Sequence, residues 1–224
     1  MILKRVLEPE VMDSPEEAED YNAMDHSEVN RLFVSDLLQF AESCGKPIGV
    51  VLDLGTGTAL IPIELCERET DCRVMAIDMS INMLELARYN IEAAGLIERI
   101  ELAQVDAKQM AFPDGMFSSV ISNSIIHHIP EPCDCVREMV RVTASGGLLY
   151  VRDLLRPETD EQVEHLVQTY AGQENEHSRQ MFDDSLRAAL SMDEIRELVV
   201  QNGFAAEDVQ ATTDRHWTWA SIQA

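Results

Sequence analysis

Three aspartates and a pair of adjacent histidines are the residues of this chain whose types and spacing could do chemistry. Asp53, Asp78 and Asp106 each lie at the end of a short apolar run that is typical of a strand, and His127 and His128 follow another. Because the carboxyl ends of parallel strands meet at one edge of a sheet, we expect the three carboxylates to line a ligand-binding edge. Carboxylates accept hydrogen bonds from hydroxyl and ammonium groups, and a neutral imidazole can accept a proton near pH 7.

The element that must position the first aspartate is residues 50–65, an apolar run followed by Gly55, Gly57 and a helical pattern. Strand, glycine turn and helix are the geometry in which open α/β folds bind a nucleotide-like cofactor, and glycine lets the backbone approach the ligand. A dinucleotide fingerprint needs a third glycine at the position of Leu60, and Asp53 would repel its phosphates. S-adenosylmethionine carries an ammonium and a sulfonium and no phosphate, so its charge suits Asp53. A dinucleotide-dependent dehydrogenase is the disfavoured alternative.

The spacing of Asp53, Gly55 and Gly57 resembles the first motif of class I S-adenosylmethionine-dependent methyltransferases, acidic-x-Gly-x-Gly-x-Gly, with Ala59 replacing the last glycine. Residues 112–118, Phe-Pro-Asp-Gly-Met-Phe-Ser, precede an apolar strand, small polar residues and histidines. That order resembles the small-molecule branch of the family, of the methyltransferase type 11/25 kind. The Asn-Pro-Pro-aromatic signature of many DNA-base and glutamine N-methyltransferases is absent after this strand.

The resemblance implies an α/β, Rossmann-like fold: a seven-stranded mixed sheet with helices on both faces and an antiparallel last strand. It implies S-adenosyl-L-methionine as cofactor and S-adenosyl-L-homocysteine as product. Asp53 would bind the amino-acid end, Asp78 the ribose hydroxyls and Asp106 the adenine amino group. The further cofactor contacts that it implies are Gly55, Thr56, Gly57, Met79, Ala107, Asn123, Ser124 and Tyr21.

The function that this pattern favours is transfer of a methyl group to a small-molecule acceptor by in-line displacement. A base is needed only where the acceptor must lose a proton, and His127 and His128 are the candidates, with His128 slightly favoured. The alternative for the pair is structural, with one ring packed in the fold and the other at a helix end. A cofactor-binding regulatory or scaffolding protein without catalysis also stays open, and the acceptor atom is undetermined.

The length of 224 residues predicts one domain spanning 1–224. By resemblance, residues 1–45 form a helical lid, in which Tyr21, His26 and Asn30 would face the methionine end of the cofactor. Residues 156–190 form a helical insertion that covers the substrate. Its candidate substrate contacts are His165, Tyr170, His177, Arg179 and Phe182.

Composition restricts the partners. A formal net charge of -24 repels nucleic acids and anionic membranes, so neither is expected as a partner. Solubility and a salty habitat are equally open explanations of the acidity. No apolar run reaches membrane-spanning length, no signal peptide is visible, and five cysteines without Cys-x-x-Cys spacing suggest free thiols. We expect a cytoplasmic monomer or homodimer that acts on a small molecule, with no metal site.

Overall fold

The computed structural model describes residues 3–11, 14–23 and 27–224. The chain divides into two compact units. The smaller unit comprises Met1–Glu10, Ser124–Pro132 and Arg152–Trp219, and the larger comprises Val11–Asn123, Cys133–Val151 and Ala220–Ala224. The expectation of a single domain over the whole length stays a prediction.

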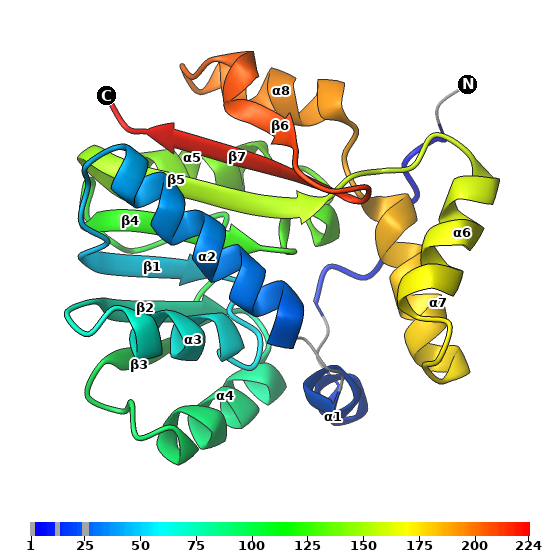
Figure 1. Cartoon of the computed structure of the whole chain (residues 1–224), viewed down its shortest axis with the longest axis horizontal. Helices are drawn as coiled ribbons and strands as arrows, with labels where there is room; N and C mark the ends of the chain where they lie inside the picture. Colours follow the sequence, from blue (N-terminus) through cyan, green and yellow to red (C-terminus); the bar gives the residue numbers. More distant parts are fainter. Residues whose placement is uncertain (1–2, 12–13, 24–26) are drawn as a thin grey trace. The chain divides into compact units, whose positions relative to one another are not determined.

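The strands form one seven-stranded sheet in the order β3-β2-β1-β4-β5-β7-β6. Strands β1 to β4 pair in parallel, whereas β6 and β7 pair in antiparallel fashion, so the predicted mixed sheet is confirmed (Figure 1). The strands are β1 (Val50–Leu54), β2 (Arg73–Asp78), β3 (Ile100–Gln104), β4 (Phe117–Asn123), β5 (Thr143–Leu154), β6 (Val209–Ala211) and β7 (His216–Ile222).

In the larger unit, helices cover both faces of the sheet. These helices are α1 (Pro15–Ala23), α2 (Ser27–Ser43), α3 (Leu60–Arg68), α4 (Ile81–Ala93) and α5 (Cys133–Val142). Figure 1 shows α2 and α3 in front of the strands and α5 behind them. Phe33 and Leu37 of α2 share a buried cluster with Val51 of β1, while the next residue along that strand, Leu52, is equally buried. Burial on both faces explains why these strands are apolar without alternation.

The smaller unit holds the segment that was expected to be a helical insertion. Its helices are η1 (Ile126–His128), α6 (Asp160–Tyr170), α7 (Glu176–Ala188), α8 (Met192–Gln201) and η2 (Ala206–Asp208). Val163, Leu166 and Leu186 of α6 and α7 pack into a small apolar cluster, and the two helices lie side by side (Figure 1). Ser191 and Glu194 form a capping box at the start of α8.

Two predicted boundaries are wrong. Strand β3 ends at Gln104, so Asp106 and Ala107 lie in the turn after the strand and do not end it. The residue types at 144–147, Ala-Ser-Gly-Gly, predict a turn, but these residues belong to β5, because backbone bonds pair them with the C-terminal end of the chain. The amide of Gly146 donates to the Gln223 carbonyl over 2.8 Å, and the Gln223 amide donates to the Gly147 carbonyl over 2.9 Å.

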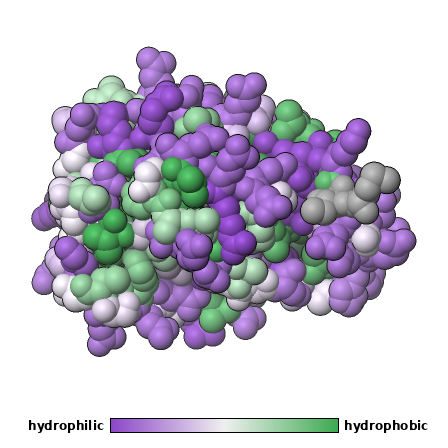
Figure 2. Space-filling view, turned by 90° about the horizontal axis from the view of Figure 1, so that it is seen from above, coloured by the Kyte–Doolittle hydropathy of each residue, from purple (hydrophilic) through white to green (hydrophobic). Residues whose placement is uncertain are grey.

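The surface is mainly polar on the face that Figure 2 shows, where apolar residues come to the surface in small groups. Trp217 and Trp219 of β7 are fully buried. Among the helices of the described residues, none combines the length and the hydropathy that crossing a bilayer requires.

Candidate functional site

The three aspartates form a stepped row along neighbouring strands of the larger unit. In the register of the sheet, Asp53 lies opposite Ala76, and Asp78 lies opposite Gln104. Each carboxylate therefore stands further along the strand direction than the one before it, and Asp106 follows the end of its strand. Asp53 is only 2% exposed, whereas the Asp106 side chain is 37% exposed. The row thus runs from a buried end to a solvent-facing end.

At the buried end of the row, one oxygen of the Asp53 carboxylate is unsatisfied. Burial, together with the negative charge of Asp78, raises the pKa of Asp53 to about 7. Its Oδ2 atom has no hydrogen-bond partner among the described residues. A buried anion without a partner is costly, so this atom is suited to a cationic donor supplied by a ligand.

The glycine turn is tied to the middle carboxylate. Gly55 and Gly57 have φ angles of 66° and 53°, which glycine adopts without steric strain. The Gly57 amide donates to Asp78 Oδ2 over 2.8 Å, and the Ser80 amide donates to Asp78 Oδ1 over 2.9 Å. A carboxylate oxygen can accept more than one hydrogen bond, so these two bonds do not by themselves exclude ribose hydroxyls from Asp78. The Thr56 amide donates to the Ile77 carbonyl over 2.9 Å and closes the turn onto β2.

The exposed end of the row differs in its surroundings. Asp106 accepts a hydrogen bond from the Lys108 amide over 2.9 Å and forms a 3.0 Å ion pair with the Lys108 ammonium. Burial opposes ionisation, but these Lys108 contacts prevail and hold the pKa of Asp106 below its usual value. Ala107 is buried, and Met79 is 41% exposed after the end of β2. An adenine at Asp106 would therefore meet a carboxylate that is already paired.

Tyr21 and Asn123 are the other expected contacts within the larger unit. A Cβ atom on Gly57 would lie 3.5 Å from Tyr21 Cε1, so this ring packs over the glycine turn. Burial and the charges of Asp78 and Asp53 raise the pKa of Tyr21 to about 12. Asn123 Oδ1 is buried without a hydrogen-bond partner in the described part of the chain. His26 lies outside the described residues.

These features fit a cofactor with an amino-acid end. Several buried oxygen atoms on the turn and the neighbouring strand ends lack hydrogen-bond partners in the described ranges. Each can accept a hydrogen bond, but they cannot all be satisfied by bonds to one another. They are Asp53 Oδ2, Thr56 Oγ1, Thr58 Oγ1 and Asn123 Oδ1. An ammonium group offers several donors to such acceptors, whereas a phosphate would offer none.

The two histidines lie in a separate cluster, inside the smaller unit. His127 Nδ1 is 2.5 Å from Asp153 Oδ1, and both side chains are almost fully buried. Asp153 also accepts the amides of Ile126 over 2.5 Å and Leu154 over 2.6 Å. A carboxylate with this many donors stays ionised and fixes the His127 ring in one orientation. Ser124, which precedes the pair, has a left-handed φ of 63° and donates its amide to the Arg152 carbonyl.

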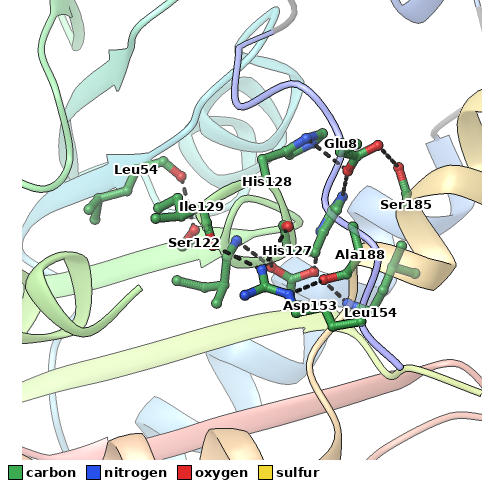
Figure 3. Close-up of polar contacts among 12 residues, drawn as sticks. Glu8, Leu54, Ser122, His127, His128, Ile129, Asp153, Leu154, Ser185 and Ala188 are labelled. Atoms are coloured by element: carbon green, nitrogen blue, oxygen red, sulfur yellow. Dashed lines mark hydrogen bonds and ion pairs between the residues drawn. The ribbon is translucent and has the colours of Figure 1, made fainter. Parts of the chain in front are cut away.

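Glu8 covers the same histidines from the N-terminal segment. Glu8 Oε1 lies 3.0 Å from His128 Nδ1 and 3.5 Å from His127 Nε2 (Figure 3). The two imidazole rings are 4.1 Å apart between centroids. Arg5 fixes this segment, because its guanidinium donates to the carbonyls of Ala188, Pro130, His127 and Ile129 over 2.6–3.0 Å.

The charges of the cluster support one another. Burial would lower the pKa of His127, but the Asp153 and Glu8 carboxylates outweigh burial and raise it. Burial would likewise raise the pKa values of Glu8 and Asp153, yet the histidine contacts hold both below their usual values. His127 and His128 are recognisable from the sequence, whereas Glu8, Arg5 and Asp153 are not. Glu8 and Arg5 stand in an irregular N-terminal stretch, and Asp153 lies near the end of β5, so no local pattern marks them.

The candidate substrate contacts of the insertion do not form one group. His165 lines a pocket of about 510 Å³, together with Arg156 and Gln162. Tyr170 donates to Asp214 over 2.7 Å, and Phe182 packs against the apolar cluster of α6 and α7. His177 and Arg179 are exposed on α7.

Comparisons with known proteins agree with this fold. The family described as "Methyltransferase domain" matches residues 46–203. Phosphatidylethanolamine N-methyltransferase of Cereibacter sphaeroides is 39% identical over 99 residues, which cover 44% of this chain and 47% of that protein. The 27-O-demethylrifamycin SV methyltransferase of Amycolatopsis mediterranei (strain S699) is 28% identical over 175 residues, covering 76% of this chain and 60% of that one. This chain spans about half the length of the curated relatives that it matches.

Solved structures share the fold at low identity. The plantazolicin methyltransferase BpumL in complex with S-adenosylhomocysteine superposes with a TM-score of 0.74 at 13% identity, covering 94% of this chain and 91% of that chain. A SAM-dependent methyltransferase from Aquifex aeolicus gives a TM-score of 0.65 at 17% identity, covering 94% and 99%.

Proposed function

The chain belongs to the methyltransferase-domain family, and on this premise we propose that it transfers a methyl group from S-adenosylmethionine to a small-molecule acceptor. The observation that carries the proposal is the stepped row of carboxylates beside a glycine turn, whose innermost member, Asp53, is buried with an unpartnered oxygen. When bound, the cofactor supplies a methyl group that its sulfonium makes electrophilic. The chain's own residues must therefore bind the cofactor and the acceptor, orient them, and exclude water.

Each part of the row has a role suited to its burial. Asp53 Oδ2 and Asn123 Oδ1 would accept hydrogen bonds from the ammonium, because these buried oxygens lack a donor among the described residues. Asp78 would accept ribose hydroxyls while it holds the Gly57 turn. Asp106 and Ala107 would contact adenine, and Lys108 keeps the Asp106 carboxylate ionised at the exposed end. The other proposed contacts are Gly55, Thr56, Gly57, Met79, Ser124 and Tyr21.

His127 and His128 are proposed as the groups that take a proton from an acceptor that must lose one. Asp153 at His127 Nδ1 orients that ring and stabilises the imidazolium that would form. His127 is thus better supported as a base than the sequence indicated, when His128 was slightly favoured. His128 is the more exposed of the two, with 19% of its side chain accessible against 3% for His127.

A small-molecule acceptor is supported by charge and by the relatives' names. A net charge of -24 opposes nucleic acid as a partner. Residues 123–126 read Asn-Ser-Ile-Ile where base and glutamine N-methyltransferases carry Asn-Pro-Pro-aromatic. Relatives are named for phosphatidylethanolamine, demethylrifamycin and demethylmenaquinone. The names of these relatives give no support to the alternative of a cofactor-binding protein that does not catalyse. All five cysteines are free, which suits the cytoplasmic location we propose.

Calorimetry and a labelled-cofactor screen test the proposal together. The chain should bind S-adenosylmethionine and S-adenosylhomocysteine at one site and fail to bind NAD, and Asp53→Ala should abolish that binding. Incubation with methyl-labelled cofactor and a metabolite extract should then transfer label to a small molecule. Binding without any transfer across a broad extract would favour the non-catalytic alternative, and tight NAD binding would overturn the assignment.

A further inference from the structure

We propose that Glu8, His127 and His128 form a binding site for one divalent transition-metal ion. No sequence pattern marks such a site, because Glu8 is far from the histidines along the chain and lies in an irregular stretch. The fold of the smaller unit brings one ligand atom from each residue together, and these atoms all lie within 4.8 Å of one another. The inference goes beyond the proposed methyl transfer, because it concerns metal binding by these three residues and not the reaction of the cofactor.

The distances suit a bound ion. Donor atoms that lie about 2.0–2.1 Å from a tetrahedral zinc ion are separated from each other by roughly 3.3 Å. Glu8 Oε1 lies 3.0 Å from His128 Nδ1 and 3.5 Å from His127 Nε2, on either side of that separation (Figure 3). The third separation, between the two histidine nitrogens, is at most 4.8 Å, so the rings would rotate toward each other to close around an ion.

The hydrogen-bond assignments in the cluster leave a place for a cation. Asp153 accepts the backbone amides of Ile126, His127 and Leu154, so it is an acceptor, and the His127 ring proton belongs on Nδ1 between the two side chains. With the ring neutral, His127 Nε2 presents a lone pair toward the Glu8 carboxylate, so a metal ion bound there would take the place of the second ring proton that Asp153 and Glu8 favour. Glu8 Oε1 and His128 Nδ1 are both buried, and neither makes a well-directed hydrogen bond within the described residues.

Asp153 has the position of an outer-sphere carboxylate. Metal-binding histidines commonly donate their second ring N–H to a carboxylate, which fixes the tautomer and makes the ligating nitrogen more basic. The 2.5 Å contact between His127 Nδ1 and Asp153 Oδ1 is of this type. Arg5 adds preorganisation, because its hydrogen bonds to the Ala188 and Ile129 carbonyls hold the N-terminal segment that carries Glu8.

The donor set selects the class of metal. Two imidazoles and one carboxylate suit zinc, cobalt or iron(II), whereas magnesium and calcium prefer oxygen ligands. Three protein ligands also leave a coordination position open, as in catalytic sites rather than closed structural sites. An acceptor hydroxyl bound there would lose its proton more readily. With the ion in place, His127 would act as a ligand and not as a base.

Zinc and cobalt titrations of the full chain test the site. After treatment with a chelator, the wild-type protein should bind one zinc ion per chain in competition with a chromophoric chelator. Cobalt should give visible absorption of a four-coordinate ion. Glu8→Gln and His128→Gln should each lower zinc affinity at least about 100-fold, and Asp153→Asn by about 10- to 100-fold. Glu10→Gln on the same segment and His165→Gln on α6 are the matched controls and should bind as wild type.

Folding of each variant is checked by its affinity for S-adenosylhomocysteine, which should stay unchanged. Wild-type protein that binds no stoichiometric zinc would overturn the proposal, and so would undiminished binding by Glu8→Gln and His128→Gln. Magnesium binding as tight as zinc binding would also contradict it. Failure of the metal site leaves cofactor binding untouched, so it is distinguishable from failure of the proposed methyl transfer.

Discussion

The backbone amide of Gly57 donates a hydrogen bond to the Asp78 carboxylate over 2.8 Å. The glycine turn after β1 and the acidic end of β2 are therefore one physical unit, although 20 residues stand between them in the sequence. Asp78 holds the turn in shape through one oxygen and the start of α4 through the other, by way of the Ser80 amide. A change at either residue should affect both the turn and the ligand.

Asp78→Asn should weaken both stability and cofactor binding. The amide that replaces one oxygen is a donor, so either Gly57 or Ser80 loses its acceptor, which costs about 1–3 kcal/mol in the free energy of unfolding. Loss of the charged acceptor for ribose should lower cofactor affinity by about 10- to 100-fold. Urea unfolding and calorimetry measure the two effects. Asp71→Asn, an exposed position before β2, is the control; an equal loss there would contradict the prediction.

Gly57→Ala should separate backbone strain from ligand contact. Gly57 and Gly45 have φ angles of 53° and 62°, and alanine in this region costs about 1–2 kcal/mol of stability. A new Cβ meets only Tyr21 at 3.5 Å at the first position and nothing within 4 Å at the second, so both variants should fold. Only Gly57→Ala should lose cofactor affinity, by calorimetry. Equal affinities would mean that the backbone at Gly57 does not approach the cofactor.

The pKa of Asp53 predicts a pH-dependent gain on its replacement. The folded pKa is about 7, above the ordinary value of 3.8, so the native carboxyl keeps its proton over a range in which the unfolded chain has lost it. As pH rises through this range, the free energy of unfolding of the wild type falls. Above pH 7 the wild type bears the full cost of burying the ionised carboxylate.

At pH 8, Asp53→Asn should therefore unfold at a higher urea concentration than wild type, with a free energy of unfolding about 2–4 kcal/mol larger. Near pH 4 the two proteins should differ little in stability. The same variant should lose affinity for S-adenosylmethionine. A gain of equal size at both pH values would show that charge burial is not the cause.

His128→Ala should lower turnover by about 10²–10⁴-fold if this ring takes or positions the acceptor's proton. Cofactor affinity should stay unchanged, because His128 is not among the proposed cofactor contacts. His127→Ala is a less clean test, since it removes a donor from the buried Asp153 and should destabilise the protein by about 1–3 kcal/mol. Steady-state kinetics with calorimetry make the comparison, and unchanged turnover would remove His128 from the mechanism.

Much of the fold could be predicted because its signals are local. The bounds of α2 and β2 follow from apolar spacing, and the Ser80 cap and the Ser191–Glu194 box follow from short polar motifs. The wrong boundaries have non-local causes. Residues 144–147 read as a turn because they contain two glycines, but pairing with the far end of the chain makes them a strand. Asp106 follows β3 because that strand is shorter than its apolar pattern.

The sequence by itself determined the order of strands and helices, the glycine turn and the three acidic positions, since each depends on neighbours along the chain. Only the tertiary structure decided the burial of Asp53, the bond from Gly57 to Asp78, and the meeting of Glu8 with His127 and His128. Residues so distant in the chain are brought together by packing and strand register, and neither can be predicted from local residue spacing.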